Sequence, residues 1–222
     1  MTPLLLIDMD DTLYEERDYV ISGFQYIARH LHRENPAAAH IDSDDMVQFM
    51  LTYMDTHGRG AIFNKMLDHY HIPYDPKMIK HLVNLYRNHS PAIRLYEGVY
   101  DCLEHLKVGH RLALVTDGLP LMQVNKIKAL ELDTIMDHLF YPWSYDAPKP
   151  NKQSYAHPVH TLGYTAKDCI IIGDNPINDG GPASAMGIPF WQIHSPRKTQ
   201  ADFAARVFLK FTDIAPYLDS TL

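Results

Sequence analysis

The sequence predicts an α/β protein with a doubly wound parallel sheet as its core and an all-helical domain inserted into that core. Short runs made entirely of apolar residues recur along the chain, and such runs are typical of strands that helices cover on both faces. From about residue 95 onward these runs alternate with helix-like stretches, which indicates a parallel sheet. Between residues 14 and 92 the patterning is helical.

The apolar runs predict the strands of the core. Most of them end at a polar or turn-forming residue, and Pro189 lies near the start of the last run. The predicted strands are Leu4–Ile7, Leu112–Val115, Leu139–Tyr141, Cys169–Ile172 and Ile188–Ile193. Because an open parallel sheet binds ligands beyond the carboxyl ends of its strands, the residues that follow these runs are candidates for a functional site.

Helical spacing predicts further elements of the core. Apolar residues at three-residue steps indicate a helix over Leu119–Leu130, and a shorter pattern covers Tyr100–Leu106. Pro158 lies inside a third helical stretch, Lys152–Leu162. Proline has no N–H group and its ring clashes with the preceding turn, so we expect either a kink or a late helix start there.

The inserted segment is expected to contain helices separated by breaks at proline and glycine residues. The helical patterns cover Tyr19–Leu31, Asp44–Met54, Ile62–His69 and Met78–Tyr86. We therefore expect a core formed by residues 1–13 and 93–222 and a helical domain formed by residues 14–92.

Composition and charge disfavour several classes of protein. The 222 residues are 46% hydrophobic and 21% charged, as in ordinary globular proteins, and the formal charge of −7 disfavours binding to a nucleic acid polymer. Cys102 and Cys169 form no CxxC pair, so neither a disulfide framework nor a zinc ribbon is expected. The apolar runs are too short for a signal peptide or a membrane span, and we expect a cytoplasmic protein without a membrane partner.

Acidic residues follow the first predicted strand. Asp8 and Asp10 lie two residues apart on the loop that leaves this strand, so both carboxylates can face the crevice beyond the sheet. One such carboxylate can act as a nucleophile while the other transfers a proton, provided that their environments differ. An acidic turn or a calcium loop is the alternative, but Leu13 stands where an EF-hand loop requires glycine.

Polar residues also follow later strands and loops. The segment Thr116-Asp117-Gly118 ends the second core strand, where a hydroxyl group and backbone N–H groups could hold phosphate oxygens. Lys149 lies between two prolines, which restrict the backbone and present its side chain. Asp174 and Asp179 follow another apolar run, and oxygen-rich sites of this kind suit Mg²⁺.

Together these segments resemble the haloacid dehalogenase-like hydrolase superfamily, in motif order and over nearly the whole chain. The motifs of that family are Asp-x-Asp-x-Thr, a Thr or Ser after an apolar strand, a Lys, and Gly-Asp followed by a later Asp. They match, in order, Asp8, Asp10 and Thr12, then Thr116, then Lys149, and finally Asp174 and Asp179. The resemblance implies a Rossmann-like core, and the helical insert has the position of the cap domain in one branch of the family.

The resemblance also implies a reaction. Asp8 would attack phosphorus and form an aspartyl-phosphate, while Asp10 would protonate the leaving oxygen and then activate water. In such reactions, positioning and cation placement supply most of the catalysis. The implied phosphate contacts are Thr116, Lys149 and the backbone N–H groups of Asp117 and Gly118. The implied Mg²⁺ ligands are Asp8, the Asp10 carbonyl and Asp174, with Asp179 as a direct or water-mediated ligand or as an anchor for Lys149.

Asp10 distinguishes two branches of this family. The dehalogenases generally lack an acid at that position, because displacing a halide requires no proton, whereas an alkoxide leaving group does. Asp10 therefore favours hydrolysis of a phosphomonoester on a small metabolite, such as a nucleotide or sugar phosphate. Asp117 departs from the Asn that is common after the second motif, and we expect little consequence because its backbone N–H group is the expected contact.

Several other residues are weaker candidates for substrate contacts. They are Arg59 and Lys65 in the helical insert, and Tyr14, Glu15 and Arg17 just after the first motif. The 14 histidines lack a supporting set of ligands with zinc spacing, so zinc is not expected. Three rival functions use the same fold: a phosphomutase with the same nucleophile, a phosphonate-cleaving enzyme with Lys65 as its nominal Schiff-base residue, and a non-catalytic phosphate-binding or scaffold protein.

Overall fold

The computed structural model describes residues 2–220, and contacts divide the chain into two compact units. The larger unit consists of Met1–Glu16 and Arg94–Leu222, and the smaller unit is Arg17–Ile93. The boundaries expected from the sequence, after residue 13 and after residue 92, lie slightly earlier along the chain.

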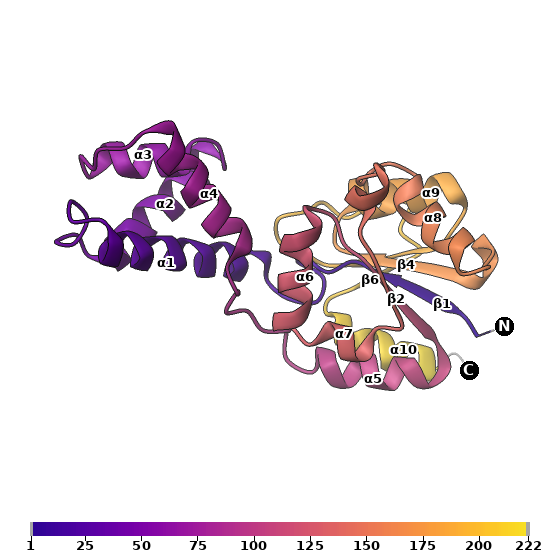
Figure 1. Cartoon of the computed structure of the whole chain (residues 1–222). Coiled ribbons are helices and arrows are strands. Elements are labelled where there is room, and N and C mark those ends of the chain that lie inside the picture. The colour runs from indigo at the N-terminus through magenta and orange to yellow at the C-terminus, as the bar shows by residue number, and fades with distance from the viewer. Residues whose placement is uncertain (1, 221–222) are drawn as a thin grey trace. The chain divides into compact units, whose positions relative to one another are not determined.

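A six-stranded parallel sheet forms the centre of the larger unit (Figure 1), with the strand order β3-β2-β1-β4-β5-β6. The strands are β1 (Leu4–Ile7), β2 (Arg111–Val115), β3 (His138–Phe140), β4 (Cys169–Gly173), β5 (Phe190–Ile193) and β6 (Arg206–Phe208). The predicted doubly wound α/β core is therefore confirmed. Each strand predicted from an apolar run is present, β1 with the predicted ends and the others with slightly different ends.

Strand β1 lies in the middle of this sheet. Leu4 is paired with Arg111 of β2 on one side and with Cys169 of β4 on the other. Beyond the end of β1, the backbone N–H group of Asp8 donates to the carbonyl of Ile172 at 2.9 Å. The backbone of Asp8 is therefore fixed by the sheet.

The differences from the predicted strands have local causes. Strand β5 begins at Phe190, two residues later than expected, because Pro189 has no N–H group to donate to the ladder. Strand β6 was not predicted at all. It is an edge strand in which Arg206 and Val207 are exposed, so it carries no apolar run.

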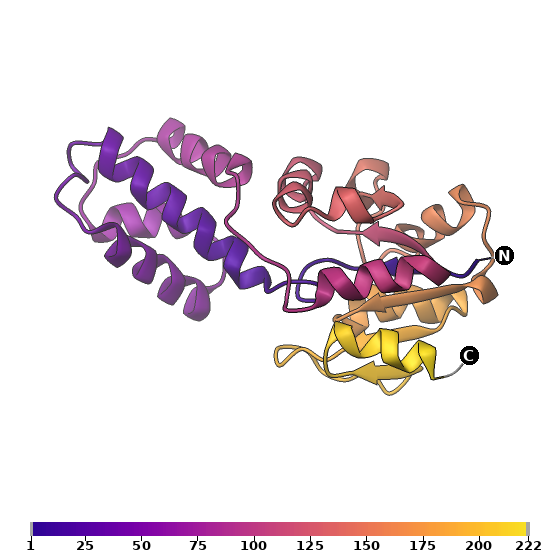
Figure 2. The same cartoon turned by 90° about the horizontal axis from the view of Figure 1, so that it is seen from below.

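Helices cover both faces of the sheet (Figures 1 and 2). Helices α5 (Val99–Gly109) and α10 (Ile214–Asp219) pack together on one face, and α8 (Gln153–Thr161) and α9 (Gly181–Met186) pack together on the other. Helices α6 (Pro120–Ala129) and α7 (Leu132–Ile135) connect β2 to β3. Single turns of other helix types are η1 (Pro142–Tyr145), η2 (Ala166–Asp168), η3 (Pro176–Gly180) and η4 (Phe211–Asp213).

Helix α8 differs from the expectation for Pro158. The helix begins at Gln153, so the late start that we considered is wrong. Tyr155, Pro158 and Val159 are all buried. Packing of this face therefore stabilises the helix across a residue that cannot donate a backbone hydrogen bond.

The smaller unit consists of helices with a core of their own. Its helices are α1 (Glu16–Glu34), whose first residue belongs to the larger unit, α2 (Ser43–His57), α3 (Ile62–His69) and α4 (Pro76–Asn88). Asp42 and Asp75 cap α2 and α4, because their side chains accept backbone N–H groups of the first turns at 2.7 and 2.8 Å. The helices predicted in this segment are all present.

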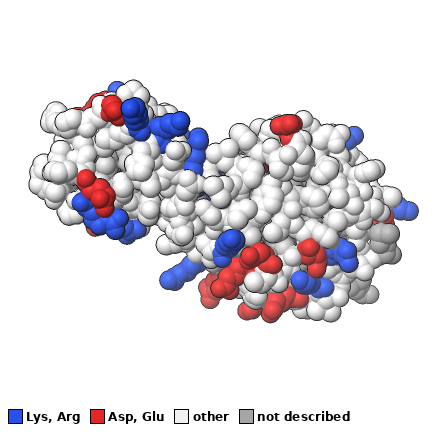
Figure 3. Space-filling model, in the orientation of Figure 1, with Lys and Arg blue, Asp and Glu red and all other residues white. Residues whose placement is uncertain are grey.

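Surface charge and helix composition relate to the expectations that the chain binds neither a nucleic acid polymer nor a membrane. Figure 3 shows that acidic side chains gather over the part of the larger unit that contains α5 and α7. Among residues 2–220, no helix combines the length and the apolar content needed to cross a membrane. The expectation that the chain binds no nucleic acid polymer stays a prediction.

Candidate active site

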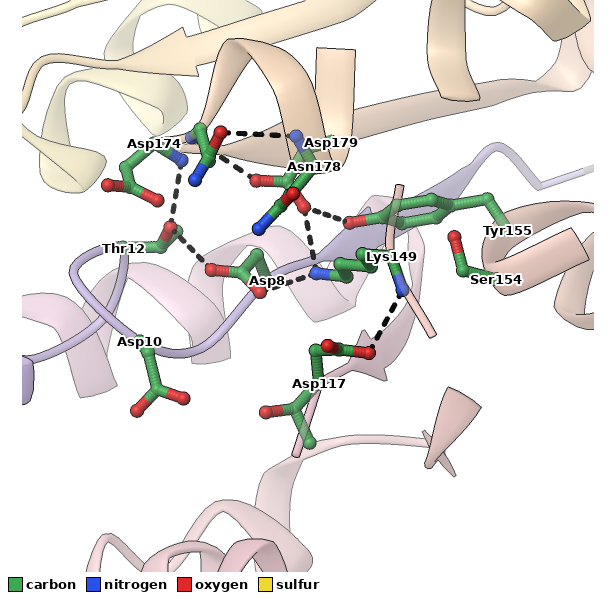
Figure 4. A network of polar contacts seen from close by, with 12 residues as sticks. Asp8, Asp10, Thr12, Asp117, Lys149, Ser154, Tyr155, Asp174, Asn178 and Asp179 are labelled. Carbon is green, nitrogen blue, oxygen red and sulfur yellow. Dashed lines mark hydrogen bonds and ion pairs between the residues drawn. The ribbon is translucent and has the colours of Figure 1, made fainter. Parts of the chain in front are cut away.

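Asp8 lies at the carboxyl end of the central strand, and both of its carboxylate oxygens have a partner (Figure 4). Oδ1 accepts a hydrogen bond from Lys149 Nζ at 2.5 Å, and Oδ2 accepts one from the hydroxyl group of Thr12 at 3.1 Å. The Thr12 oxygen in turn accepts the backbone N–H group of Asp174 at 3.1 Å. Residues of the first, third and fourth motifs therefore meet at one carboxylate.

A tight turn brings Thr12 back to Asp8. The backbone N–H groups of Thr12 and Leu13 donate to the carbonyl of Met9 at 3.3 and 2.9 Å. Asp11, inside this turn, has a φ of 59°, in the left-handed region that aspartate tolerates better than most residues. The spacing of Asp-x-Asp-x-Thr is therefore the spacing that this turn needs.

Lys149 joins two carboxylates from different segments, Asp8 just after β1 and Asp179 in η3. Its Nζ lies 2.5 Å from Asp8 Oδ1 and 2.8 Å from Asp179 Oδ1, and its side chain is almost completely buried. Burial lowers the pKa of Lys149, but the charges of Asp179 and Asp8 outweigh that effect and raise it well above its usual value. Lys149 is therefore a permanent cation inside the site.

Asp179 holds Lys149 in place. Its Oδ1 accepts the hydroxyl group of Tyr155 at 2.7 Å in addition to Lys149, and its Oδ2 accepts the backbone N–H group of Asn175 at 3.2 Å. A Cβ atom on Gly173 would lie only 2.4 Å from Asp179 Oδ2, so a residue with a side chain does not fit there. These contacts are the ones expected of an anchor for Lys149, one of the roles considered for Asp179.

Asp174, unlike Asp179, has a carboxylate oxygen without a hydrogen-bond donor among the described residues. It is 3% exposed, and its Oδ2 is buried without a hydrogen-bond partner among the described residues. Such an orphaned acceptor costs about 1–3 kcal/mol unless a ligand satisfies it. Burial, followed by the charge of Asp179, raises the pKa of Asp174 to about 7.

The carboxylates fit a hard divalent cation. Asp8, Asp174 and Asp179 each offer an oxygen, and these atoms lie within 4.8 Å of one another. Burial also raises the pKa of Asp8 well above its usual value, against the attraction of Lys149. One ammonium group thus faces three buried carboxylates, and Mg²⁺, which prefers oxygen ligands, would balance the remaining charge.

Asp10 lies in a separate network. Figure 4 shows its side chain pointing away from Asp8. Its Oδ1 accepts the Tyr14 hydroxyl group at 2.5 Å and Lys126 Nζ at 2.7 Å, and its Oδ2 accepts Gln123 Nε2 at 3.1 Å. Burial raises the pKa of Asp10, but Lys126 and the other donors outweigh it, so the pKa lies below the usual value. Asp8 and Asp10 therefore differ in environment, with the pKa of Asp8 raised and that of Asp10 lowered, and the division of labour between them stays a prediction.

The second motif differs in part from the expectation. Thr116 is completely buried, and its hydroxyl oxygen accepts a hydrogen bond from Gln123 Nε2 at 2.5 Å. The side chain of Asp117 accepts the backbone N–H group of Lys149 and the indole N–H group of Trp143, both at 3.1 Å. The carboxylate of Asp117 thus braces the loop of Lys149, a contact that the expectation of a backbone role left out.

A cavity of about 180 Å³ opens above these residues. Its lining includes Asp8, Asp10, Asp117, Lys149, Asp174 and Asp179, and it does not include Thr116 or Gly118. Residues that the sequence did not single out complete the lining: Asp11, Glu16, Asn175, Asn178 and Lys198. The cavity is smaller than the usual pocket for a drug-sized ligand, and its size suits a phosphoryl group and an ion.

Other candidate residues have local partners. Tyr14 contacts Asp10, as described above. Glu15 accepts a hydrogen bond from Arg197, Arg17 pairs with Asp55 at 2.7 Å, and Lys65 lies 3.9 Å from Asp68 on the same helix. Arg59 is exposed.

Sequence reasoning missed three buried residues of the site: Gln123, Lys126 and Tyr155. Gln123 and Lys126 are three residues apart, so they share one face of α6, and polar residues at such positions of a core helix were an available signal. Tyr155 lies six residues after Lys149 in a sequence that reads as an ordinary buried helix face. No sequence signal distinguished it from a core residue.

Comparison with known proteins places these features in a wider group. The sequence profile of a family described as haloacid dehalogenase-like hydrolase matches residues 5–193. A protein named glyceraldehyde 3-phosphate phosphatase from Methanocaldococcus jannaschii is 25% identical over 188 residues, which cover 83% of this chain and 81% of the relative. A protein named pyrophosphatase PpaX from Halalkalibacterium halodurans is 29% identical over 107 residues, which cover 46% of this chain and 50% of the relative.

Solved structures share the fold over nearly the whole chain. The hydrolase YfnB from Bacillus subtilis, solved with bound magnesium, superposes with a TM-score of 0.72 at 16% identity and 98% coverage of both chains. A 2-haloacid dehalogenase from Pseudomonas syringae superposes with a TM-score of 0.69 at 16% identity and 100% coverage of both chains. At these identities the similarity establishes the fold and leaves the reaction to the residues of the site.

Proposed function

The chain belongs to the haloacid dehalogenase-like hydrolase family, and on that premise we propose that it is a magnesium-dependent phosphatase that acts on a small phosphorylated metabolite. The resemblance of its motifs to that family is thereby confirmed. The buried ion pair of Asp8 and Lys149, beside the unpartnered oxygen of Asp174, supports this proposal most directly. Asp8, Lys149 and Asp174, which would serve as nucleophile, phosphate-binding cation and metal ligand, all line one small cavity.

The metal would be held by the carboxylates of Asp8 and Asp174 and by the backbone carbonyl of Asp10. When bound, Mg²⁺ would neutralise charge on the phosphoryl oxygens and on the buried carboxylates. Asp179 would anchor Lys149 beside the metal, and a direct or water-mediated contact of Asp179 with the metal stays an alternative. All of these residues line the cavity.

In the first step, an Asp8 oxygen attacks phosphorus and the ester P–O bond breaks. Lys149 stabilises the negative charge that spreads over the equatorial phosphoryl oxygens. Asp10 donates its proton to the departing oxygen, so the products of this step are the alcohol and an aspartyl-phosphate on Asp8. An approaching phosphate dianion raises the pKa of Asp10, which favours the protonated form that this step needs.

In the second step, water attacks the phosphorus of the aspartyl-phosphate. Asp10, now ionised, takes a proton from that water, and the bond between phosphorus and the Asp8 oxygen breaks. The products are inorganic phosphate and the free Asp8 carboxylate. The contacts of Tyr14, Gln123 and Lys126 with Asp10 stabilise the ionised form that acts as the base here.

The acid at position 10 favours a phosphatase over a dehalogenase, although both occur among the solved structures with this fold. A halide leaves without a proton, whereas an alkoxide needs one. The names of two relatives support a small substrate such as a triose phosphate or pyrophosphate, and nucleotide and sugar phosphates stay candidates from the sequence. A cytoplasmic location also stays a prediction.

Hydrolysis of 4-nitrophenyl phosphate tests the proposed reaction. Activity should require Mg²⁺, disappear with a chelator and return when Mg²⁺ is added in excess. Asp8→Asn should abolish turnover of this substrate. Asp10→Asn should reduce the turnover of alkyl phosphates, whose leaving groups are poor, by about 10²–10⁴-fold. Asp133→Asn, an exposed carboxylate on α7, is the matched control and should keep full activity.

Unchanged turnover in Asp8→Asn would refute the assignment of the nucleophile. Activity that persists in the chelator would refute the metal requirement. A panel that includes glyceraldehyde 3-phosphate, pyrophosphate, nucleoside monophosphates and hexose phosphates would then identify the substrate class, with release of inorganic phosphate as the measurement.

A further inference from the structure

Two buried side chains on α6 contact the carboxylate of Asp10. Lys126 donates to Oδ1 at 2.7 Å, and Gln123 donates to Oδ2 at 3.1 Å. Lys126 is 4% exposed and Gln123 is 1% exposed. Because the two residues are three positions apart on one helix, a single rigid element holds both oxygens.

Burying an ammonium group without a catalytic or structural reason is costly. The desolvation of a buried ion pair commonly offsets its Coulombic attraction, so such a pair is weak evidence for stability and is often retained to fix one arrangement. Here the ion pair fixes the orientation of the Asp10 carboxylate. Tyr14 adds a third donor, so the plane and rotamer of the carboxylate are both determined.

Gln123 also links Asp10 to the second motif. Its Nε2 donates both to Asp10 and to the hydroxyl oxygen of Thr116, at 3.1 and 2.5 Å. Both amide hydrogens are therefore used, and the Nε2 group must face this side because a carboxylate can only accept. Gly118 has a φ of 126°, and a Cβ atom added there would lie only 3.3 Å from the Gln123 side chain.

We propose that Lys126 and Gln123 are positioning residues for protonation of the leaving group, and that they act by holding the Asp10 carboxyl group in one orientation. This inference rests on the proposed function, because it needs an ester whose departing oxygen takes a proton from Asp10. Proton transfer requires a donor within about 2.6–3.2 Å of the acceptor, so a carboxyl group free to rotate spends less time in reach.

The dependence of the rate on the leaving group separates this role from a general structural one. A nitrophenolate departs without a proton, whereas the alkoxide of an alkyl phosphate needs one. The measurement is kcat/KM, because this ratio covers the steps up to release of the alcohol and is independent of the later hydrolysis of the aspartyl-phosphate. The substrates are 4-nitrophenyl phosphate and the alkyl phosphate that the wild-type protein hydrolyses best.

Lys126→Met keeps the length of the side chain and removes its charge, and Gln123→Met removes both amide hydrogens. In each variant we expect kcat/KM for the alkyl ester to fall at least about tenfold further than for the aryl ester. Lys128→Met is the matched control, because Lys128 lies on the exposed side of α6. Its ratio of kcat/KM for the alkyl ester to kcat/KM for the aryl ester should equal that of the wild type. Thermal unfolding of each variant reports whether the fold is retained.

An equal loss on both esters in a folded variant would overturn the proposal, and so would wild-type behaviour. If Lys126→Met fails to fold, the ratio in Gln123→Met decides the question by the same criterion. A wild-type protein that hydrolyses neither ester would instead refute the proposed function, and this inference would fall with it.

Discussion

Tyr155→Phe removes one buried hydroxyl group and leaves the ring in place. The hydroxyl group donates to Asp179 Oδ1 at 2.7 Å, and Asp179 carries the charge that anchors Lys149. Burial, followed by the charge of Asp179, raises the pKa of Tyr155 well above its usual value, so this group stays a donor at every working pH. A hydrogen bond to a charged acceptor contributes about 1.5–3 kcal/mol, and we expect the free energy of unfolding to fall by about that amount.

Tyr145→Phe is the matched control for this variant. The Tyr145 hydroxyl group donates to the neutral carbonyl of Ser154 at 2.9 Å, so its loss should cost only about 0.5–1.5 kcal/mol. Urea unfolding followed by near-ultraviolet circular dichroism measures both losses at one pH. Equal losses in the two variants, or no loss in Tyr155→Phe, would refute the reasoning that Asp179 is a buried charge stabilised by its donors.

Three further predictions concern other parts of the chain. Gly173→Ala should destabilise the larger unit by about 1–3 kcal/mol and reduce activity, because its Cβ would lie 2.4 Å from Asp179 Oδ2. In the metal-free protein, Asp174 binds its proton more tightly when folded, with a pKa of about 7 against 3.8. The free energy of unfolding should therefore fall as the pH rises from about 4 to about 7, and Mg²⁺ should stabilise the protein more at pH 8 than at pH 6. Arg17→Ala should cost at most about 1 kcal/mol, because its pair with Asp55 is exposed.

Each of these predictions has a simple check. Gly109→Ala, where an added Cβ meets open space, is the control for Gly173→Ala and should leave stability nearly unchanged. Thermal unfolding with and without Mg²⁺ at several pH values measures the linkage to Asp174, and a stabilisation that is the same at every pH would contradict it. A loss well above 1 kcal/mol in Arg17→Ala would show that this surface pair matters more than its exposure indicates.

The sequence carried enough information to predict the strands and the residues at their ends. Leu4–Ile7 and Cys169–Ile172 are apolar throughout because both faces of those strands are covered, and this makes them visible without a structure. Once the strands are known, parallel pairing brings Asp8 and Asp174 to the same edge of the sheet. Local pattern and topology therefore sufficed for this part of the site.

Side-chain direction was not predictable in the same way. The short strand β6 was missed because two of its residues face solvent. The contacts of Asp10 with Gln123 and Lys126 depend on how α6 is rotated about its axis, which the spacing of its apolar residues fixes only roughly. The hydroxyl group of Thr116 faces Gln123 for the same reason, and no motif records that contact.

The central position of β1 has a consequence for biosynthesis. Leu4–Ile7 leave the ribosome before the two strands that pair with them, because β2 ends at Val115 and β4 ends at Gly173. At about 5–20 residues per second, on the order of ten seconds pass before even the nearer neighbour exists. During that interval this fully apolar segment has no strand to pair with, while the helices of Arg17–Ile93 can already pack against one another. The nascent chain therefore carries the strand that will hold Asp8 as an exposed, aggregation-prone segment, and this makes it a natural target for chaperones that bind short apolar runs.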